Sequence, residues 1–265
     1  MDDKLYKYPR THHIEGSRLQ PGDEDLSAIP FKHLKGRYLV VEEKVDGANA
    51  GLSFDSDGQL LLQSRGHYLT GGWRERHFNM FKQWANHHAA TLHEVLFDKY
   101  VLYGEWLYAK HTIFYDLLPH YFMEFDIYEK ESGLFLSTKK RRELLADLPV
   151  VSVRVLHEGK VSSLKDLKAM IGVSAFISDD HITNLRQVAS KLRLDEERAV
   201  KETDCSPQME GLYVKVEEEG VVKERYKFIR PEFLTAVTQA EGHWLNRPII
   251  PNRLKEDANM YSFKS

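Results

Sequence analysis

The fold is decided by residues 37–54, which read Arg-Tyr-Leu-Val-Val-Glu-Glu-Lys-Val-Asp-Gly-Ala-Asn-Ala-Gly-Leu-Ser-Phe. Two apolar runs, 37–43 and 49–54, flank Asp46-Gly47 and predict two strands joined at a turn. Lys44 stands where the first strand bends into the second. A flexible amine at a strand end, beside a glycine that lets a ligand approach the backbone, suits attack on a phosphorus atom. The same pattern is also that of an ordinary β-hairpin with a solvated lysine.

The rest of the chain predicts one α+β domain built on antiparallel sheet, because strand patterns recur without an internal repeat or a clear linker. Further strands are expected at 59–64, 100–107, 121–128, 211–217 and 221–229. Helices are expected at 74–96, after Ser137-Thr138, at 163–171 and 179–194, and from 196 onward. We expect an N-terminal arm, 1–36, with little regular structure, and a short helical tail, 231–265.

Composition sets limits on the class of protein. The chain has 265 residues and a formal net charge of −3, so any contact with nucleic-acid phosphates must come from a local basic patch. A single cysteine, Cys205, excludes an internal disulfide and a zinc site made of paired cysteines. The N-terminus lacks the layout of a secretory signal, and no apolar run reaches membrane-spanning length. We therefore expect a cytoplasmic protein.

Acidic residues stand inside two of the predicted strands. Glu105, Glu124 and Asp126 lie among aromatic residues, where a half-buried carboxylate is costly unless it is paired or hydrogen-bonded. At least one of the three is expected to face a site. Glu124 and Asp126 are two residues apart, so they also fit a shared solvent-facing side.

Basic residues form three notable groups. Lys215, Arg225 and Lys227 alternate with apolar residues and so line one face of the two last strands, which fits either an anion site or solvent exposure. The run 139–142 fits a nucleic-acid contact or a solvated helix face. In the arm, 8–18 is dense in phosphate-binding donors, and it either lines the site or forms a solvated loop.

Several short motifs, taken together and in this order, resemble those of the covalent nucleotidyltransferases, the superfamily of polynucleotide ligases and capping enzymes. Within it, the chain is most similar to ATP-dependent RNA ligases. The motifs are Lys44-Val45-Asp46-Gly47, Ser64-Arg65-Gly66, Tyr103-Gly104-Glu105-Trp106, Phe125-Asp126-Ile127, Glu210-Gly211-Leu212-Tyr213-Val214-Lys215 and Arg225-Tyr226-Lys227-Phe228. They span roughly residues 37–230, and the resemblance implies the nucleotidyltransferase fold, the ATP-grasp-like adenylation fold of ligases.

The resemblance also implies a reaction. Lys44 would attack the α-phosphorus of ATP, release pyrophosphate and hold AMP; AMP would pass to a 5′-phosphate end of RNA, and a 3′-hydroxyl would seal the strand. The implied catalytic residues are Lys44, Asp46, Lys227 and Arg225. The implied nucleotide contacts are Glu43 (through its backbone), Arg65, Glu105, Phe125 and Lys215, and Glu210 would bind Mg²⁺ or Mn²⁺. Lys227, Arg225 and the metal would lower the pKa of Lys44.

The chain departs from the family pattern in two ways. Arg225 replaces a lysine, so any proton-donor role falls to Lys227. Only 231–265 follow the last motif, too few for the OB-fold barrel of DNA ligases and capping enzymes. Substrate grip is therefore expected from the arm, through Arg10, His12 and Arg18, or from a separate protein partner.

Other functions stay open at this stage. A ligase for nicked DNA or RNA–DNA hybrids is the nearest alternative, because recognition of a 2′-hydroxyl leaves no readable motif. GTP transfer of the capping type fits less well without the barrel. From a different class, a non-catalytic module that binds nucleotide or nucleic acid would keep the fold, although the intact Lys44, Glu105, Glu210 and Lys227 argue against it.

Overall fold

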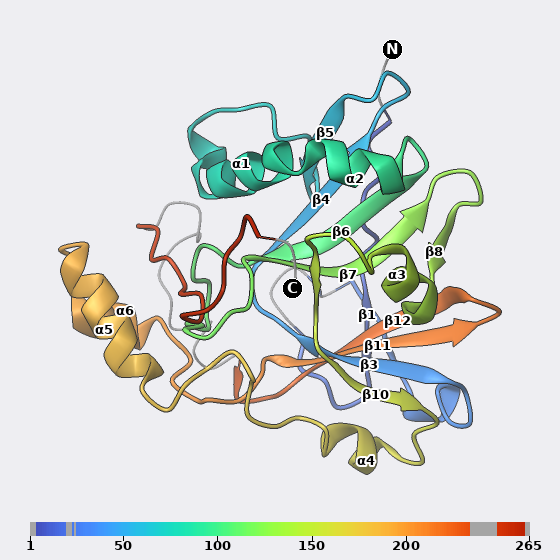
Figure 1. The fold of residues 1–265 in the computed structure, drawn as a ribbon. Helices are drawn as coiled ribbons and strands as arrows, with labels where there is room; N and C mark the ends of the chain where they lie inside the picture. Colours follow the sequence, from blue (N-terminus) through green and yellow to red (C-terminus); the bar gives the residue numbers. More distant parts are fainter. Residues whose placement is uncertain (1–3, 20–22, 24, 234–247, 263–265) are drawn as a thin grey trace.

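A computed structural model describes residues 4–19, 23, 25–233 and 248–262, and its fold is drawn in Figure 1. Its strands are β1 (His12–Ile14), β2 (Ala28–Ile29), β3 (Leu39–Lys44), β4 (Ala48–Phe54), β5 (Leu60–Ser64), β6 (Tyr100–Trp106), β7 (Phe122–Glu129), β8 (Leu134–Leu136), β9 (Val151–Ser152), β10 (Val155–Gly159), β11 (Gly211–Glu218) and β12 (Val221–Ile229). Its helices are η1 (Phe31–His33), η2 (Trp73–Phe78), α1 (Asn79–His87), α2 (Ala89–Leu96), α3 (Thr138–Leu144), α4 (Leu164–Lys168), α5 (His181–Lys191) and α6 (Glu196–Lys201). The predicted α+β fold is confirmed.

In the described part of the chain the strands form one sheet, whose path runs β10-β3-β11-β12-β8-β7-β6-β4-β5. Neighbours along this path are antiparallel, as predicted, whereas β1 and β9 attach in parallel to β12 and β7. The expected strands are all present. The expected helix at 74–96 is instead three shorter segments, η2, α1 and α2. Of the helical tail expected at 231–265, residues 234–247 lie outside the described residues, and the described part 248–262 contains no helix.

The segment between β3 and β4 is not a hairpin turn. β3 pairs with β10 and β11, whereas β4 pairs with β5 and β6, so the chain crosses here from one half of the sheet to the other. Gly47 is needed at this crossing, because a Cβ there would lie 2.7 Å from the carbonyl oxygen of Trp106. The Asp46-Gly47 pair predicts a β-hairpin turn, but pairing with distant strands outweighs this local preference. The hairpin interpretation is therefore wrong.

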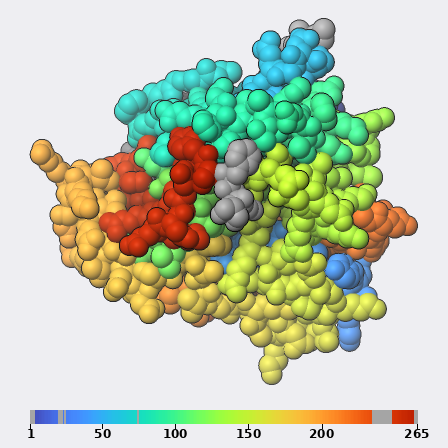
Figure 2. All heavy atoms as spheres, viewed as in Figure 1, coloured from blue at the N-terminus to red at the C-terminus, as the bar shows by residue number. Residues whose placement is uncertain are grey.

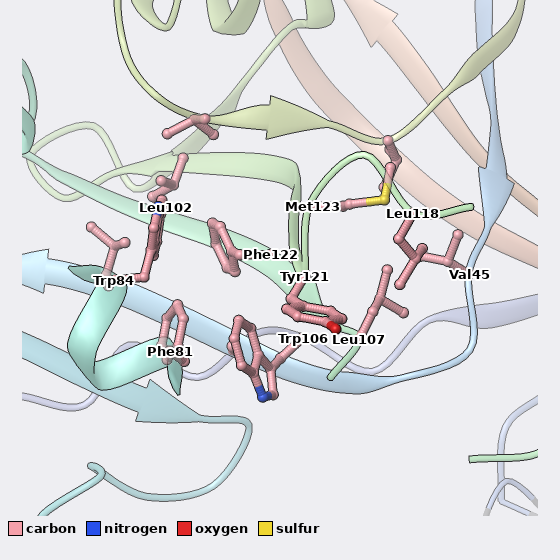
Figure 3. Packing of buried hydrophobic residues seen from close by; sticks show 14 of the residues in the cluster. Val45, Phe81, Trp84, Leu102, Trp106, Leu107, Leu118, Tyr121, Phe122 and Met123 are labelled. Atoms are coloured by element: carbon pink, nitrogen blue, oxygen red, sulfur yellow. The ribbon is translucent and has the colours of Figure 1, made fainter. Parts of the chain in front are cut away.

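Each half of the sheet has its own apolar core. In the half that contains β4, β6 and β7, helix α1 packs Phe81 and Trp84 against Trp106 and Phe122, as Figure 3 shows. Helix α2 adds Leu92 and Leu96 to the same core. The other half packs β3, β11 and β12 against α4 and the N-terminal arm. The arm is thus more ordered than predicted, because β1 extends the sheet beside β12 and η1 adds Phe31 to the core.

Residues 248–262 lie across one face of the molecule, and Figure 2 shows them in red between α1–α2 in teal and α5–α6 in orange. Asn252 anchors this segment: its Oδ1 accepts from the amide of Tyr115 at 2.9 Å, and its Nδ2 donates to the carbonyl of Leu107 at 2.7 Å. The segment therefore supports the loop 107–118. In the described residues, no helix combines the length and apolar character that crossing a membrane requires.

A buried cluster of charges connects the two halves, and we call Glu42, Glu124, Asp126, Arg141 and Lys215 the buried ion cluster. Arg141 pairs with Glu42 at 2.6 Å and with Glu124 at 2.7 Å, and Lys215 pairs with Glu42 at 2.8 Å and with Asp126 at 3.2 Å. Each side chain is at most 2% exposed. The solvent-facing alternative for Glu124 and Asp126 is therefore wrong, and Arg141 points inward from the basic run 139–142.

Removal of the central cation should destabilise the fold. Arg141→Met is expected to lower the free energy of unfolding by about 3–5 kcal/mol, because it leaves the carboxylates of Glu42 and Glu124 buried with too little positive charge. Arg142→Met is the matched control: the Arg142 side chain is 52% exposed and pairs with Glu158 at the surface, so a loss below about 1 kcal/mol is expected. Urea unfolding measures both. Equal losses in the two variants would contradict a structural role for the cluster.

Candidate active site

Lys44 lies at the end of β3 in a cavity of about 1110 Å³ whose wall comes from both halves of the sheet and from the N-terminal arm. Most of the residues predicted from the sequence share this wall. They are Glu43, Lys44, Asp46, Arg65, Glu105, Phe125, Glu210 and Lys227. Lys215 and Arg225, both among the described residues, lie outside it.

Three carboxylates surround the Lys44 amine. Its Nζ donates to Oε2 of Glu210 at 2.7 Å, and its side chain is 22% exposed. Burial by itself would lower the pKa of Lys44, but the charges of Glu210, Glu105 and Asp46 outweigh burial and raise that pKa. The sequence predicts a lowered pKa from neighbouring cations. In the structure the three carboxylates outweigh the neighbouring cations, so the pKa of Lys44 is raised and its amine is an ammonium at neutral pH; the effect of a bound metal stays a prediction.

The two glutamates at the site differ from ordinary surface carboxyls. Burial raises the pKa of Glu105 and of Glu210 to about 7 in each case, and the nearby Lys44 opposes the rise. Oε1 of Glu105 also accepts from the amide of Gly47 at 3.1 Å, so the crossing segment and β6 are tied together at this point. At neutral pH each carboxyl is close to its midpoint, and the charge around Lys44 responds to small changes in environment.

Asp46 is held by backbone amides. Its Oδ2 accepts from the amides of Thr112 and Ile113 at 2.7 and 2.9 Å, and its own amide donates to the Tyr115 hydroxyl at 2.9 Å. These bonds fasten the crossing segment to the loop 107–118, which Asn252 supports. The arrangement fixes the position of Lys44, two residues before Asp46.

Lys227 reaches the cavity from β12 and is paired with the arm. Its Nζ donates to Asp23, which also lies 3.1 Å from His13 and 3.4 Å from Arg10. Burial is the largest cause of a lowered pKa for Lys227; the charge of Lys44 adds to it and Asp23 opposes it. The pairing of β1 with β12 places His13 directly opposite Lys227. The arm thus contributes an acidic partner that the sequence analysis did not single out.

Other arm residues divide between the cavity and its surroundings. Tyr8, Arg10 and Thr11 line the cavity, whereas His12 and Arg18 do not. Arg18 instead donates to the carbonyl of Pro231 at 3.5 Å. Of the three arm residues proposed for substrate grip, only Arg10 is therefore in the wall.

Aromatic residues form one side of the cavity. Phe125, Tyr8 and Tyr213 all line it, and the rings of Tyr8 and Phe125 meet edge to face at 5.1 Å between centroids. The Tyr8 hydroxyl lies 2.6 Å from that of Tyr213 and donates to Asp126. The pairing between β6 and β7 shifts register beside Gly104, so that Phe125 has no partner across from it, as in a β-bulge that re-aims a side chain. Tyr8 and Tyr213 carried no distinguishing sequence signal.

Lys215 and Arg225 have structural surroundings. Lys215 is fully buried in the ion cluster. The Arg225 guanidinium lies 3.9 Å from the centre of the Phe135 ring, and its Nε is 3.7 Å from Asp126. Their predicted contacts with the nucleotide stay predictions, because both side chains lie outside the cavity wall in the described structure.

The divalent cation implied by the family fits this site only in part. Carboxylate oxygens are the ligands that Mg²⁺ and Mn²⁺ prefer, and Glu210 offers one that is buried and faces Lys44. Among the described residues, no group of three or more acidic, histidine or cysteine side chains is placed to hold a metal ion. A cation here would take Glu210 and complete its shell with water and substrate phosphates, which is the usual mode of Mg²⁺ binding at phosphoryl-transfer sites.

The side chain of Glu43 points away from Lys44 and accepts from the Ser174 hydroxyl at 2.5 Å, while its amide donates to the carbonyl of Arg154 at 2.9 Å. Burial raises the pKa of Glu43 above its ordinary value of 4.5. The folded protein therefore binds this proton more tightly than the unfolded chain does. The contribution of Glu43 to stability should therefore fall as the pH rises from about 4.5 through the raised pKa.

Glu43→Gln removes this titration. The free energy of unfolding of the wild type, measured relative to that of the variant, should fall as the pH rises above about 4.5 and should level off once the raised pKa is passed. Glu131→Gln, at an exposed position, is the control and should show a smaller change with pH. Urea unfolding across this pH range measures the difference. A difference that stays constant, or that rises with pH, would contradict the assignment of a desolvated carboxyl at Glu43.

Comparison with solved structures identifies the class of fold. A mutant Naegleria gruberi RNA ligase with ATP and Mn matches with a TM-score of 0.53 at 18% identity, over 87% of this chain and 58% of that one. An apo mutant of the same ligase matches with a TM-score of 0.53 at 17% identity, over 88% of this chain and 57% of that one. At this level of identity the likeness concerns the fold. This chain spans less than three fifths of either structure.

The RNA ligase family model matches residues 37–229, which is most of the chain, and the chain therefore belongs to the RNA ligase family. The resemblance seen in its motifs is confirmed at this level. A search of curated proteins finds no match. The matched range contains every predicted site residue from Glu43 to Lys227 and leaves out the arm that supplies Tyr8 and Asp23.

Proposed function

We propose that this chain is an ATP-dependent RNA ligase that joins a 5′-phosphate to a 3′-hydroxyl through an AMP adduct on Lys44. The observation that carries the proposal is the place of Lys44, at a strand end in a large cavity, with Glu105 and Glu210 on one side and Lys227 reaching in from β12. Membership of the RNA ligase family supports it. Residues 37–230 would form the catalytic domain, and the arm would complete its site.

The first step is nucleophilic substitution at phosphorus. The neutral Nζ of Lys44 attacks the α-phosphorus of ATP; an N–P bond forms, the bond to the bridging oxygen breaks, and pyrophosphate leaves with the electron pair. An ammonium has no lone pair to give, so Lys44 has to pass one proton to Glu210 or to water before it attacks, and the nitrogen releases a second proton to water as the N–P bond forms. A divalent cation, when bound, would neutralise charge on Glu210 and on the phosphates.

The wall of the cavity offers a partner for each part of the nucleotide. Phe125 presents a ring that can stack on adenine, and Glu105 can accept from a ribose hydroxyl. Lys227 can stabilise charge on the α-phosphate and on the leaving pyrophosphate, and this requires Nζ of Lys227 to leave Asp23. Arg65, which is exposed at the rim, can contact a phosphate. Lys215 and Arg225 would position these groups without touching the nucleotide.

Two further transfers complete the reaction. An oxygen of the RNA 5′-phosphate attacks the AMP phosphorus, and the Lys44 amine leaves and regains its proton. The 3′-hydroxyl of the second end then attacks the 5′-phosphorus, a phosphodiester bond forms, and AMP departs. Lys227 and Arg65 would again face the charge that develops.

The first test is intact mass after incubation with ATP and Mg²⁺, with GTP and NAD⁺ in parallel, followed by peptide mapping. An AMP-sized increase on Lys44 is expected from ATP alone. Lys44→Arg should abolish the adduct, because arginine keeps the positive charge but stays protonated. Lys223→Arg, on the same sheet and exposed, is the control and should label like the wild type.

Persistent labelling of Lys44→Arg would overturn the assignment of the nucleophile. A folded wild type that is not already adenylylated and forms no adduct with any nucleotide would favour a binding module. If the adduct forms, sealing of nicked RNA, DNA and hybrid duplexes then decides the substrate. Preference for DNA would replace the RNA ligase proposal with that of a DNA ligase of the same fold.

A further inference from the structure

Trp73 is the most exposed large hydrophobic residue in the described part of the chain, with 78% of its surface accessible. It stands at the start of η2 and lines the same cavity as Lys44. Neither the nucleotide chemistry nor the packing of the core uses this side chain. A tryptophan kept in water beside a reactive lysine is a candidate contact for the second substrate.

The ring of Trp73 is supported on one side. The guanidinium carbon of Arg76 lies 4.1 Å from the ring centre, which is the geometry of a cation–π contact. With Arg76 against the ring, the high exposure of Trp73 leaves most of the remaining ring surface accessible. A ring held in place in this way loses little side-chain entropy when a ligand stacks on it.

The loop before Trp73 is anchored but leaves open space. Gly71 and Gly72 have φ of 121° and 111°, which favour glycine, and the Gly71 amide donates to Oε2 of Glu75 at 2.8 Å. Lys82 pairs with the same oxygen at 2.6 Å and so ties the loop to α1. A Cβ added at Gly66, Gly71 or Gly72 would meet no atom of the described structure within 4 Å. The loop therefore leaves room for a ligand without having to move.

The charge of this rim favours a polyanion. Arg65 is exposed in this loop and lines the cavity, and its charge acts on Glu105 inside it. Arg76, against the Trp73 ring, adds a second cation. The acidic Glu75 is already paired with Lys82. An exposed aromatic ring next to cationic side chains is the arrangement with which proteins bind single-stranded nucleic acid, the ring stacking on a base and the cations contacting the backbone.

We propose that Trp73 is a stacking platform for an unpaired base of the RNA substrate. The inference rests on the proposed function for the identity of the ligand, but not on the chemistry at Lys44. The base stacks on the accessible part of the Trp73 ring, and Arg65, which lines the same cavity, contacts the RNA backbone. Because stacking uses the π-face that all bases share, the platform accepts any sequence.

Binding tests the platform without requiring catalysis. The probe is a fluorescently labelled, 5′-phosphorylated oligoadenylate RNA of twelve nucleotides, titrated with protein and followed by anisotropy at fixed low salt. Trp73→Ala should raise the Kd about tenfold, within the range measured for loss of one stacked base. Trp73→Phe keeps a smaller ring and should lose less than about threefold. Tyr38→Ala, an exposed aromatic residue outside the cavity, is the control and should bind like the wild type.

A second readout measures AMP transfer to RNA from enzyme that already carries AMP. The measured rate then does not include formation of the adduct from ATP. Trp73→Ala should raise the RNA concentration for half-maximal AMP transfer by a similar factor. Equal Kd values for Trp73→Ala and the wild type would overturn the platform, even in an active ligase. A loss in Trp73→Phe as large as that in Trp73→Ala would overturn stacking. Binding that depends on Trp73 in a protein that forms no AMP adduct would support the platform while the proposed function fails.

Discussion

The paired charges of Glu42, Arg141 and Glu124 are the interaction on which the rest of this structure depends. They lie on β3, α3 and β7, and thus join the two halves of a sheet whose apolar cores are separate. Two carboxylates buried this deeply would be costly to desolvate without the guanidinium between them. Lys215 extends the cluster to β11 and Asp126, so that four elements meet at one set of charges.

This cluster positions the cavity. Glu42 stands two residues before Lys44 on the same strand, and Asp126 follows Phe125, so fixing the two acidic residues also fixes Lys44 and the aromatic wall. Residues two apart along one strand present their side chains on the same face, which places Lys44 on the same side of β3 as Glu42. The ends of the site are therefore held by charges that are at most 2% exposed. Rigid support of this kind is what an in-line substitution at phosphorus requires.

Two cations of the cavity are paired with acidic side chains. Lys44 is paired with Glu210, and Lys227 is paired with Asp23. In a partly buried cavity, such pairs stabilise the charged form of each lysine. An amine held in its charged form is not a nucleophile. Binding of the nucleotide has to exchange these partners. The arm matters for that reason, since one of the two carboxylates belongs to it.

The sequence by itself determined the strands, their antiparallel pairing, and the placing of Lys44, Glu105 and Glu210 at strand positions where they can meet. These follow from alternation along a strand and from motifs that are local in the chain. Only the tertiary structure decided the partners of the charges. A lysine that alternates with apolar residues looks the same whether it faces water, as Lys223 does, or is buried like Lys215 against residues about ninety and about 170 positions away in the chain. The crossing at Gly47, the inward turn of Arg141 and the contact between Asp23 and Lys227 likewise depend on long-range packing, which outweighed the local signals for a hairpin, a solvated helix and a loose arm.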